Sequence, residues 1–368
     1  MNRLLLTILV AFCFQACTQE KNVLEKPSVD KKVELLSIVY RLAEKPEYSN
    51  KMLKPYVSRI EQYFEKYQNH ELIQFTKSII DERGIAFDGP MWMAMHLDDN
   101  LNLLPDVKDV WQHDPRWTKE NTEKFVLLLQ KFDKDTNFDD FFNDNADLYT
   151  EAVKRFVPIY EQVDLNWLYS FYGKKSSDLF LIKIGLGVWG NCYGVNLDYI
   201  NGNRKIYAIM GVWSCDNAGL PVYARIPDLP IVVHEFSHPF IDKLTVKNKE
   251  AFQESGQRIY SVVRNERGYV MNAEAYPSWE VILDEALTHA ATIKYMKDRN
   301  FEQSEIENWT KWMKEGFGFF WMEELVNELE NYDKQRDKYP TLESYMPKLA
   351  EAYNIWTEKI LTNTQQNE

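Results

Sequence analysis

The stretch IVVHEFSH, residues 231–238, decides how the rest of the chain is interpreted. On a helix, His234 and His238 are four residues apart and project from one face. Two imidazoles at this spacing can hold one Zn²⁺, with each nitrogen about 2.0–2.1 Å from the ion. Glu235 follows the first histidine directly, so its carboxylate can reach a water at such a site without being a ligand itself. The stretch therefore predicts a helix that carries a metal site and a general base.

The amino-acid composition does not explain this H-E-x-x-H pattern. The chain has 6 histidines and 56 acidic residues among 368, which predicts roughly 0.015 such matches by chance. The alternative interpretation is a pair of partly buried histidines on a core helix.

A second helix is predicted over residues 279–293, because apolar residues and one histidine recur there at helical spacing: Ile282, Ala286, His289 and Ile293. Glu285 lies beside this stripe, so its carboxylate is turned toward the core, where a charge is costly unless it is paired or metal-bound. We expect Glu285 to be the third metal ligand, with Asp284, on the more solvent-facing side, as the alternative. His289 is a candidate partner that orients the ligands; otherwise Glu285 and His289 form a pair at the surface edge.

These residues resemble the gluzincin (thermolysin-like, HExxH…E) group of zinc metallopeptidases. The phrase HEFSH, together with YPSW at 276–279 and DEALTHA at 284–290, resembles more closely a family of bacterial secreted and lipid-anchored zincin-like proteins. That closer match covers about residues 180–295. The resemblance implies His234, His238 and Glu285 as zinc ligands and Glu235 as general base.

One residue departs from the pattern of such peptidases. Pro239 follows His238 directly, removes the amide that would bond to the carbonyl of Glu235, and clashes there, so a kink is predicted. The spacing of the two histidines survives this change, but full catalytic competence depends on how the helix accommodates it.

The N-terminal sequence is typical of an export signal. A basic start is followed by an apolar run, Leu4 to Phe14, that is too short to span a bilayer. The stretch FQAC ending at Cys17 resembles a bacterial lipoprotein box, which implies cleavage after residue 16 and lipidation of Cys17; the alternative is an ordinary signal peptide cut nearby. Residues 17–32 are polar and predict a flexible tether. We expect a lipid-anchored protein of the bacterial cell envelope with no transmembrane helix.

Charge and cysteine usage fit this location. The formal net charge of −13 repels phosphate backbones and argues against a nucleic-acid partner. Cys192 and Cys215 flank a turn at residues 202–205 and would face each other if that turn closed a hairpin. A disulfide is plausible in an oxidising compartment, and two free cysteines are equally compatible with the sequence.

The predicted fold class is α+β and predominantly helical, with a small β-sheet beside the metal helices. Helical regions are expected at 33–175 and 301–368, on either side of a zincin-like core at 176–300. Three β-rich runs occur in that core, at 180–186, 190–197 and 205–212. The resemblance nominates 189–193 as a substrate-binding edge. Of Tyr269 and Tyr276, we choose Tyr276 as the oxyanion-stabilising tyrosine; either can instead be a packed core aromatic.

Together these features predict a zinc-dependent hydrolase in which Glu235 is the general base. A peptide or protein substrate is implied by the resemblance alone. The alternative is a non-catalytic, zincin-derived surface lipoprotein that binds a peptide or glycan. A third possibility is a structural surface protein in which the H-E-x-x-H pattern is incidental.

Overall fold

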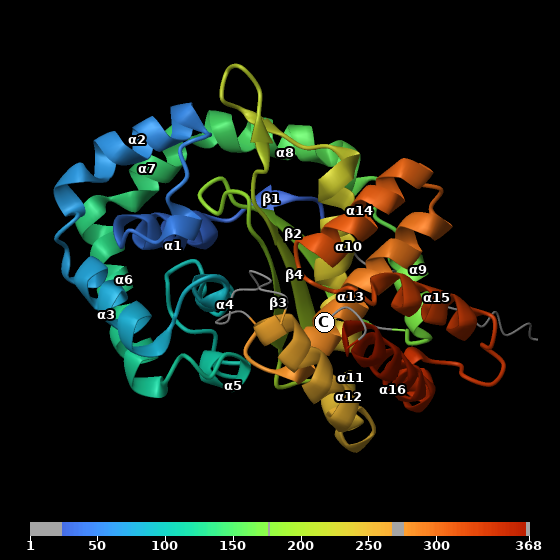
Figure 1. Ribbon diagram of the computed structural model, residues 1–368. Coiled ribbons are helices and arrows are strands. Elements are labelled where there is room, and N and C mark those ends of the chain that lie inside the picture. The colour runs from blue at the N-terminus through green and yellow to red at the C-terminus, as the bar shows by residue number, and fades with distance from the viewer. Residues whose placement is uncertain (1–23, 176, 267–275, 366–368) are drawn as a thin grey trace, which may run out of the picture.

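The computed structural model describes residues 24–175, 177–266 and 276–365. The fold is α+β and mostly helical, with a small mixed sheet, as the sequence predicted. Figure 1 shows the sheet at the centre, with most helices of the N-terminal half on one side and those of the C-terminal region on the other.

The N-terminal region is a succession of amphipathic helices that bury aromatic and aliphatic residues in a shared core. Their bounds are α1 Lys31–Leu42, α2 Lys54–Phe64, α3 Glu71–Arg83, α4 Gly89–Met95, α5 Val110–His113, α6 Lys119–Thr136, α7 Phe138–Asp144, α8 Ala146–Tyr160 and α9 Leu165–Tyr172. Helix α4 packs against α1 and against the sheet. Through α4, the N-terminal region therefore reaches the central sheet.

The main sheet has the order β1-β2-β4-β3, in which β2 is parallel to β1 and β4, and β3 is antiparallel to β4. The strands are β1 Ser28–Val29, β2 Leu179–Ile184, β3 Cys192–Asp198 and β4 Arg204–Met210; β5 Ser214–Cys215 and β6 Pro221–Val222 form a separate pair. The three predicted β-rich runs are therefore confirmed as strands. The antiparallel strand β3 is an edge of the sheet.

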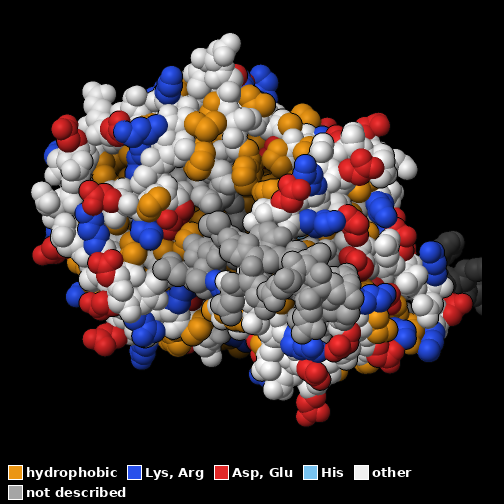
Figure 2. Space-filling view, viewed as in Figure 1, with side chains coloured by type: hydrophobic (Ala, Val, Ile, Leu, Met, Phe, Trp, Pro, Cys, Tyr) orange, Lys and Arg blue, Asp and Glu red, His pale blue; other side chains and the backbone are white. Residues whose placement is uncertain are grey.

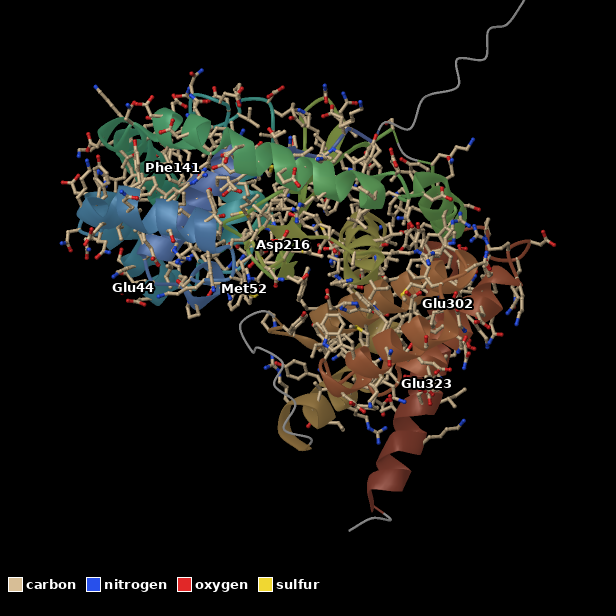
Figure 3. All side chains as sticks on the ribbon, turned by 90° about the horizontal axis from the view of Figure 1, so that it is seen from above. Glu44, Met52, Phe141, Asp216, Glu302 and Glu323 are labelled. Atoms are coloured by element: carbon tan, nitrogen blue, oxygen red, sulfur yellow. The ribbon has the colours of Figure 1, made fainter. Side chains whose placement is uncertain are left out.

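The remaining helices follow the sheet in sequence. They are α10 Arg225–Ile241, α11 Leu244–Lys247, α12 Lys249–Ser261, α13 Trp279–Asp298, α14 Gln303–Glu315, α15 Met322–Asp333 and α16 Leu342–Gln365. Helix α10 packs against β3, β4 and α13, while α14 and α15 pack on α13. Seen from above in Figure 3, Phe141 and Glu44 lie on the N-terminal side, Glu302 and Glu323 on the C-terminal side, and Asp216 between them.

Two expectations about the chain are wrong. The second half of the predicted tether is part of the fold, because Ser28–Val29 pairs with β2 and the Asp30 side chain accepts a hydrogen bond from the amide of Lys32 at the start of α1. The other correction concerns the hairpin register that would have placed Cys192 opposite Cys215; of the two alternatives left open, the structure has two free cysteines. Cys192 pairs with Met210 across the hairpin, so the register differs from the one assumed, and Cys215 lies beyond β4 in the smaller sheet.

The surface fits a water-exposed protein with mixed charge. Figure 2 shows acidic and basic side chains interspersed on one face, and hydrophobic side chains gathered in a hollow between the two helical sides. Among the helices of the described residues, none is long and apolar enough to cross a membrane. Cys17 and the signal region lie outside the described residues, so the lipid anchor stays a prediction.

Candidate metal centre

The structure brings the three predicted ligands together. His234 and His238 lie on α10 and Glu285 on α13, and their ligand atoms all lie within 4.8 Å of one another. The two Nε2 atoms are 3.2 Å apart, and Glu285 Oε1 is 3.3 Å from Nε2 of His234. Two ligands about 2.0–2.1 Å from a tetrahedral Zn²⁺ are about 3.3–3.4 Å apart. The spacing and the N,N,O donor set therefore fit zinc.

Burial and mutual contact shift the pKa values of the three clustered side chains in different directions. The neighbouring histidines hold the pKa of Glu285 well below its usual range although burial opposes this, so its carboxylate is ionised. Burial, with His289 adding to it, lowers the pKa of His234 to about 3. In contrast, the Asp242 and Glu285 carboxylates outweigh burial and raise the pKa of His238 to about 10. A metal bound through Nε2 of His238 would therefore have to displace the proton there.

Asp242 is a site residue that the sequence interpretation missed. Its Oδ1 lies 3.1 Å from Nδ1 of His238, so the carboxylate accepts the Nδ1–H and leaves the Nε2 lone pair for a metal. Asp242 is the residue directly after α10 and lies four positions after His238. That spacing was the available signal, because on a helix i and i+4 side chains lie on one face.

Asp242→Asn is expected to weaken zinc binding by about 10- to 100-fold, because the amide no longer fixes the tautomer and basicity of His238. The dissociation constant, measured by competition with a chromogenic chelator, tests this. Asp99→Asn is the matched control, since the Asp99 side chain is fully exposed. An unchanged zinc affinity in Asp242→Asn would remove Asp242 from the site.

The predicted catalytic residues line a cavity that also contains the three clustered side chains. Glu235 is only 6% exposed, and burial raises its pKa to about 7 although His238 opposes the shift. Burial and the Glu285 and Glu235 carboxylates raise the pKa of Tyr276 well above its usual value, so its phenol stays protonated. Tyr276 and Glu235 both line the cavity. Tyr269, the other candidate, lies outside the described residues.

The two candidate ligands on α13, Asp284 and Glu285, have separate roles. Asp284, the alternative ligand, accepts the amides of Lys243 and Thr245 and so holds the start of α11 against α13. His289 Nε2 lies 3.3 Å from Glu285 Oε1, and its ring is 4.2 Å from that of His234. His289 therefore lies beside two of the three clustered side chains, and its role in orienting them stays a prediction.

The backbone dihedral angles of α10 stay helical at Pro239. Its interior residue with non-helical dihedral angles is Ile226, near the start, and Pro239 lies within the last turn. The carbonyl of Glu235 has no amide to accept from at Pro239, because proline lacks an N–H. This carbonyl faces Gly194 of β3. A Cβ at Gly194 would lie only 3.4 Å from that oxygen. The carbonyl therefore lies against β3, at ordinary contact distance even from an added Cβ, and the backbone of α10 stays helical through Pro239.

Gly194 also lets β3 approach the carboxylate of Glu235. A Cβ built at this position would lie 2.9 Å from Glu235 Oε2 and 3.6 Å from a ring carbon of His238. The cavity is lined on this side by Cys192, Tyr193, Gly194 and Asn196. The sheet edge at this cavity is β3. This strand begins at Cys192, three residues after the start of the nominated stretch 189–193.

Gly194→Ala is expected to lower kcat/KM by about tenfold or more, because a small displacement of a catalytic group has a large effect on rate. Zinc content and folding are expected to be retained, since the methyl group meets the mobile end of Glu235. Gly190→Ala is the control, because a Cβ there makes only ordinary contact with Trp213. Equal activities of the two variants would show that the approach of β3 to Glu235 is unimportant.

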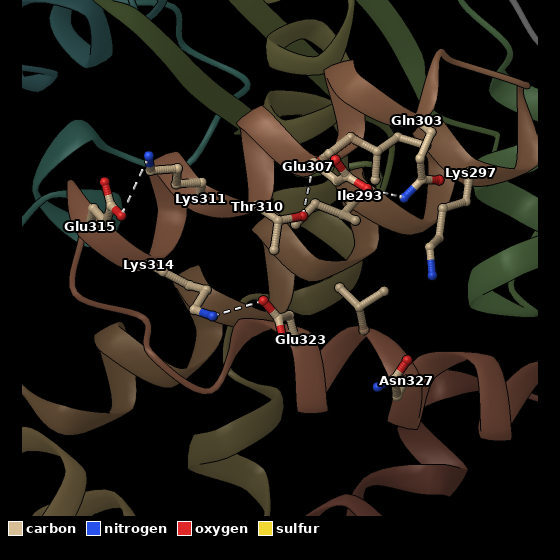
Figure 4. A pocket seen from close by; sticks show the side chains of 12 residues that line it. Ile293, Lys297, Gln303, Glu307, Thr310, Lys311, Lys314, Glu315, Glu323 and Asn327 are labelled. Carbon is tan, nitrogen blue, oxygen red and sulfur yellow. Dashed lines mark hydrogen bonds and ion pairs between the residues drawn. The ribbon is translucent and has the colours of Figure 1, made fainter.

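The cavity at the metal cluster has a volume of about 610 Å³ and reaches across to the N-terminal helices. Its far side is formed by Phe87, Asp88, Trp92, Asp114 and Arg116. A groove of similar volume, about 590 Å³, lies among α13, α14 and α15 (Figure 4). There Lys314 pairs with Glu323 and Lys311 with Glu315, so the charges of that groove largely neutralise one another. The metal-cluster cavity is therefore the candidate site.

Comparison with known proteins gives a family and no activity. A family model described as "Domain of unknown function (DUF4932)" matches residues 27–352. No curated protein and no solved structure matches the chain. The matched range includes α4, the sheet and both helices of the metal cluster, so the two sides of the cavity fall within one family domain.

Proposed function

The chain belongs to the DUF4932 family, and we propose that it is a zinc-dependent hydrolase, with a peptide as the substrate. The observation that carries the proposal is the convergence of His234, His238 and Glu285 beside a buried Glu235. A cluster of two histidines and one carboxylate matches a three-ligand catalytic zinc site, which keeps a further position open.

The roles of the residues follow from their surroundings. Zinc bound at the cluster would supply Lewis acidity toward water and a substrate carbonyl. Glu235 accepts a proton from the attacking water at its carboxylate and passes it to the leaving amine; a base with a pKa near 7 suits both transfers near neutral pH. Tyr276 remains a phenol and donates a hydrogen bond to the substrate oxygen that gains negative charge.

A peptide substrate and a zincin-like core are supported by the edge strand. Strand β3 lines the cavity and pairs with β4 on one side. Among the described residues, backbone pairing along its other edge is found at the Asp198 end, where the amide of Lys108 donates to the Asp198 carbonyl. The part of β3 next to Gly194 can therefore pair with an extended peptide by strand addition. The resemblance of the H-E-x-x-H…E motif to gluzincins points to the same substrate class.

Metal analysis combined with a peptide-cleavage assay tests this function. We expect one zinc per chain and cleavage of an internally quenched peptide library that stops with a chelator and returns with added zinc. Zinc binding without cleavage would instead support a non-catalytic peptide- or glycan-binding protein. Absence of bound zinc, even after incubation with the metal, would contradict both.

A further inference from the structure

We propose that the cavity selects substrates that carry a cationic group, an ammonium or a guanidinium, and that Asp88 is the residue that determines this specificity. The inference rests on the proposed peptide hydrolase function. It concerns the side of the cavity opposite the metal cluster, formed by Asp88, Trp92, Asp114 and Arg116, which we call the acidic wall.

The acidic wall carries an excess negative charge. Arg116 Nε and Nη2 each donate to Asp114, at 2.8 Å, and Nη2 also donates to Asp88 Oδ1 at 2.6 Å. One guanidinium therefore serves two carboxylates, which leaves one negative charge without a cation in the wall. Because Arg116 is held on both sides, it is poorly placed to bind a substrate carboxylate.

The excess charge is accessible at Asp88. The Asp88 side chain is 37% exposed, whereas that of Asp114 is 5% exposed. Asp88 Oδ2 accepts the indole N–H of Trp92 at 3.0 Å, which fixes the carboxylate at the cavity. Each carboxylate oxygen can accept more than one hydrogen bond, so Asp88 can accept a further donor from a substrate.

Aromatic residues beside Asp88 favour the same kind of ligand. Trp92 and Phe87 line the cavity next to the carboxylate, and aromatic faces attract ammonium and guanidinium groups. Among the described residues, five carboxylates and one guanidinium line the cavity: Asp88, Asp114, Glu235, Asp242 and Glu285, with Arg116. A dication at the metal cluster would not cancel this excess, so the field in the cavity attracts cations and repels anions.

Binding of matched peptides tests the inference independently of catalysis. The protein is the zinc-incubated Glu235→Gln chain, and the ligands are acetylated peptide amides that contain lysine, norleucine or glutamate at one position, scanned along the sequence. Norleucine matches lysine without the ammonium. A norleucine peptide with a free N-terminus distinguishes a terminal amine from a side-chain cation. Because the readout is a dissociation constant, failure of the wild-type chain to cleave peptides would contradict the proposed function alone.

We expect the lysine peptide, or the peptide with a free N-terminus, to bind roughly tenfold more tightly than the norleucine amide, and the glutamate peptide to bind least. Adding Asp88→Asn should reduce the preference to about twofold or less, whereas Asp99→Asn should keep it. High salt should weaken the preference of the Glu235→Gln chain for the cationic peptide. This measurement tests the charge effect even if the chain that also carries Asp88→Asn misfolds. Equal affinities, a preference that Asp88→Asn and salt leave unchanged, or no binding of any peptide would overturn the inference.

Discussion

Glu235→Gln is expected to lower kcat/KM for peptide cleavage by about 10²- to 10⁴-fold, the range that a positioned general base contributes. Glutamine has nearly the same shape as glutamate but cannot take up the proton of the attacking water. Because Glu235 is not one of the three clustered ligands, the variant should still bind one zinc per chain. Cleavage kinetics and metal analysis on the same preparation measure both properties.

The comparison requires a variant that changes the same kind of side chain elsewhere. Glu44→Gln is suitable, because the Glu44 side chain is 81% exposed and its partner is Lys77 at the surface. It should retain full activity. If Glu235→Gln kept its zinc and cleaved peptides as fast as Glu44→Gln, then Glu235 would not be the base, and another group would have to be sought.

The clustering of the three candidate ligands was predictable because their signals are local or periodic. His234 and His238 are related by one helical turn within a single helix, so their shared face follows from spacing alone. Glu285 could be nominated because a carboxylate beside an apolar stripe needs a compensating partner. The strands around residues 180–210 and the long helices were likewise predictable, because β-branched runs and helical periodicity are properties of short windows.

Other features depend on long-range packing and could not be predicted from spacing. Asp88 and Arg116 reach the metal cavity only because α4 packs against β3, more than one hundred residues later in the chain. From the sequence, Gly194 indicates at most a β-bulge. Its close approach to the Glu235 carboxylate becomes visible only when β3 lies against α10. The Cys192–Cys215 pairing depended on a hairpin register that the structure shows to be different.

The effect of Pro239 shows why a local rule can fail in a specific environment. The rule that an interior proline bends a helix is based on a clash with the carbonyl four residues earlier. Here that carbonyl belongs to Glu235 and lies at ordinary contact distance from β3, and the dihedral angles at Pro239 stay helical. Pro239 therefore does not contradict a working site, because the helix keeps both histidines on the face that Glu285 completes.

His238→Ala is expected to abolish stoichiometric zinc binding, leaving roughly a tenth of a zinc per chain or less, because only two of three protein ligands remain. In the wild-type chain, zinc at about a thousand times its dissociation constant should stabilise the folded state by about 4 kcal/mol. The variant should lose this zinc-dependent rise in Tm. Elemental analysis and thermal unfolding with and without zinc measure the two effects.

His70→Ala separates loss of the site from general damage to the protein. The His70 imidazole accepts the amide of Leu72 at the start of α3 and contacts Asp135, and it is not one of the clustered ligands. Its removal should lower Tm slightly but leave zinc content and the zinc-dependent shift intact. Zinc retained by His238→Ala at the wild-type level would mean that the metal lies elsewhere. The pair of variants therefore decides whether the H-E-x-x-H helix holds the metal, on which the roles of Glu235, Asp242 and Tyr276 all depend.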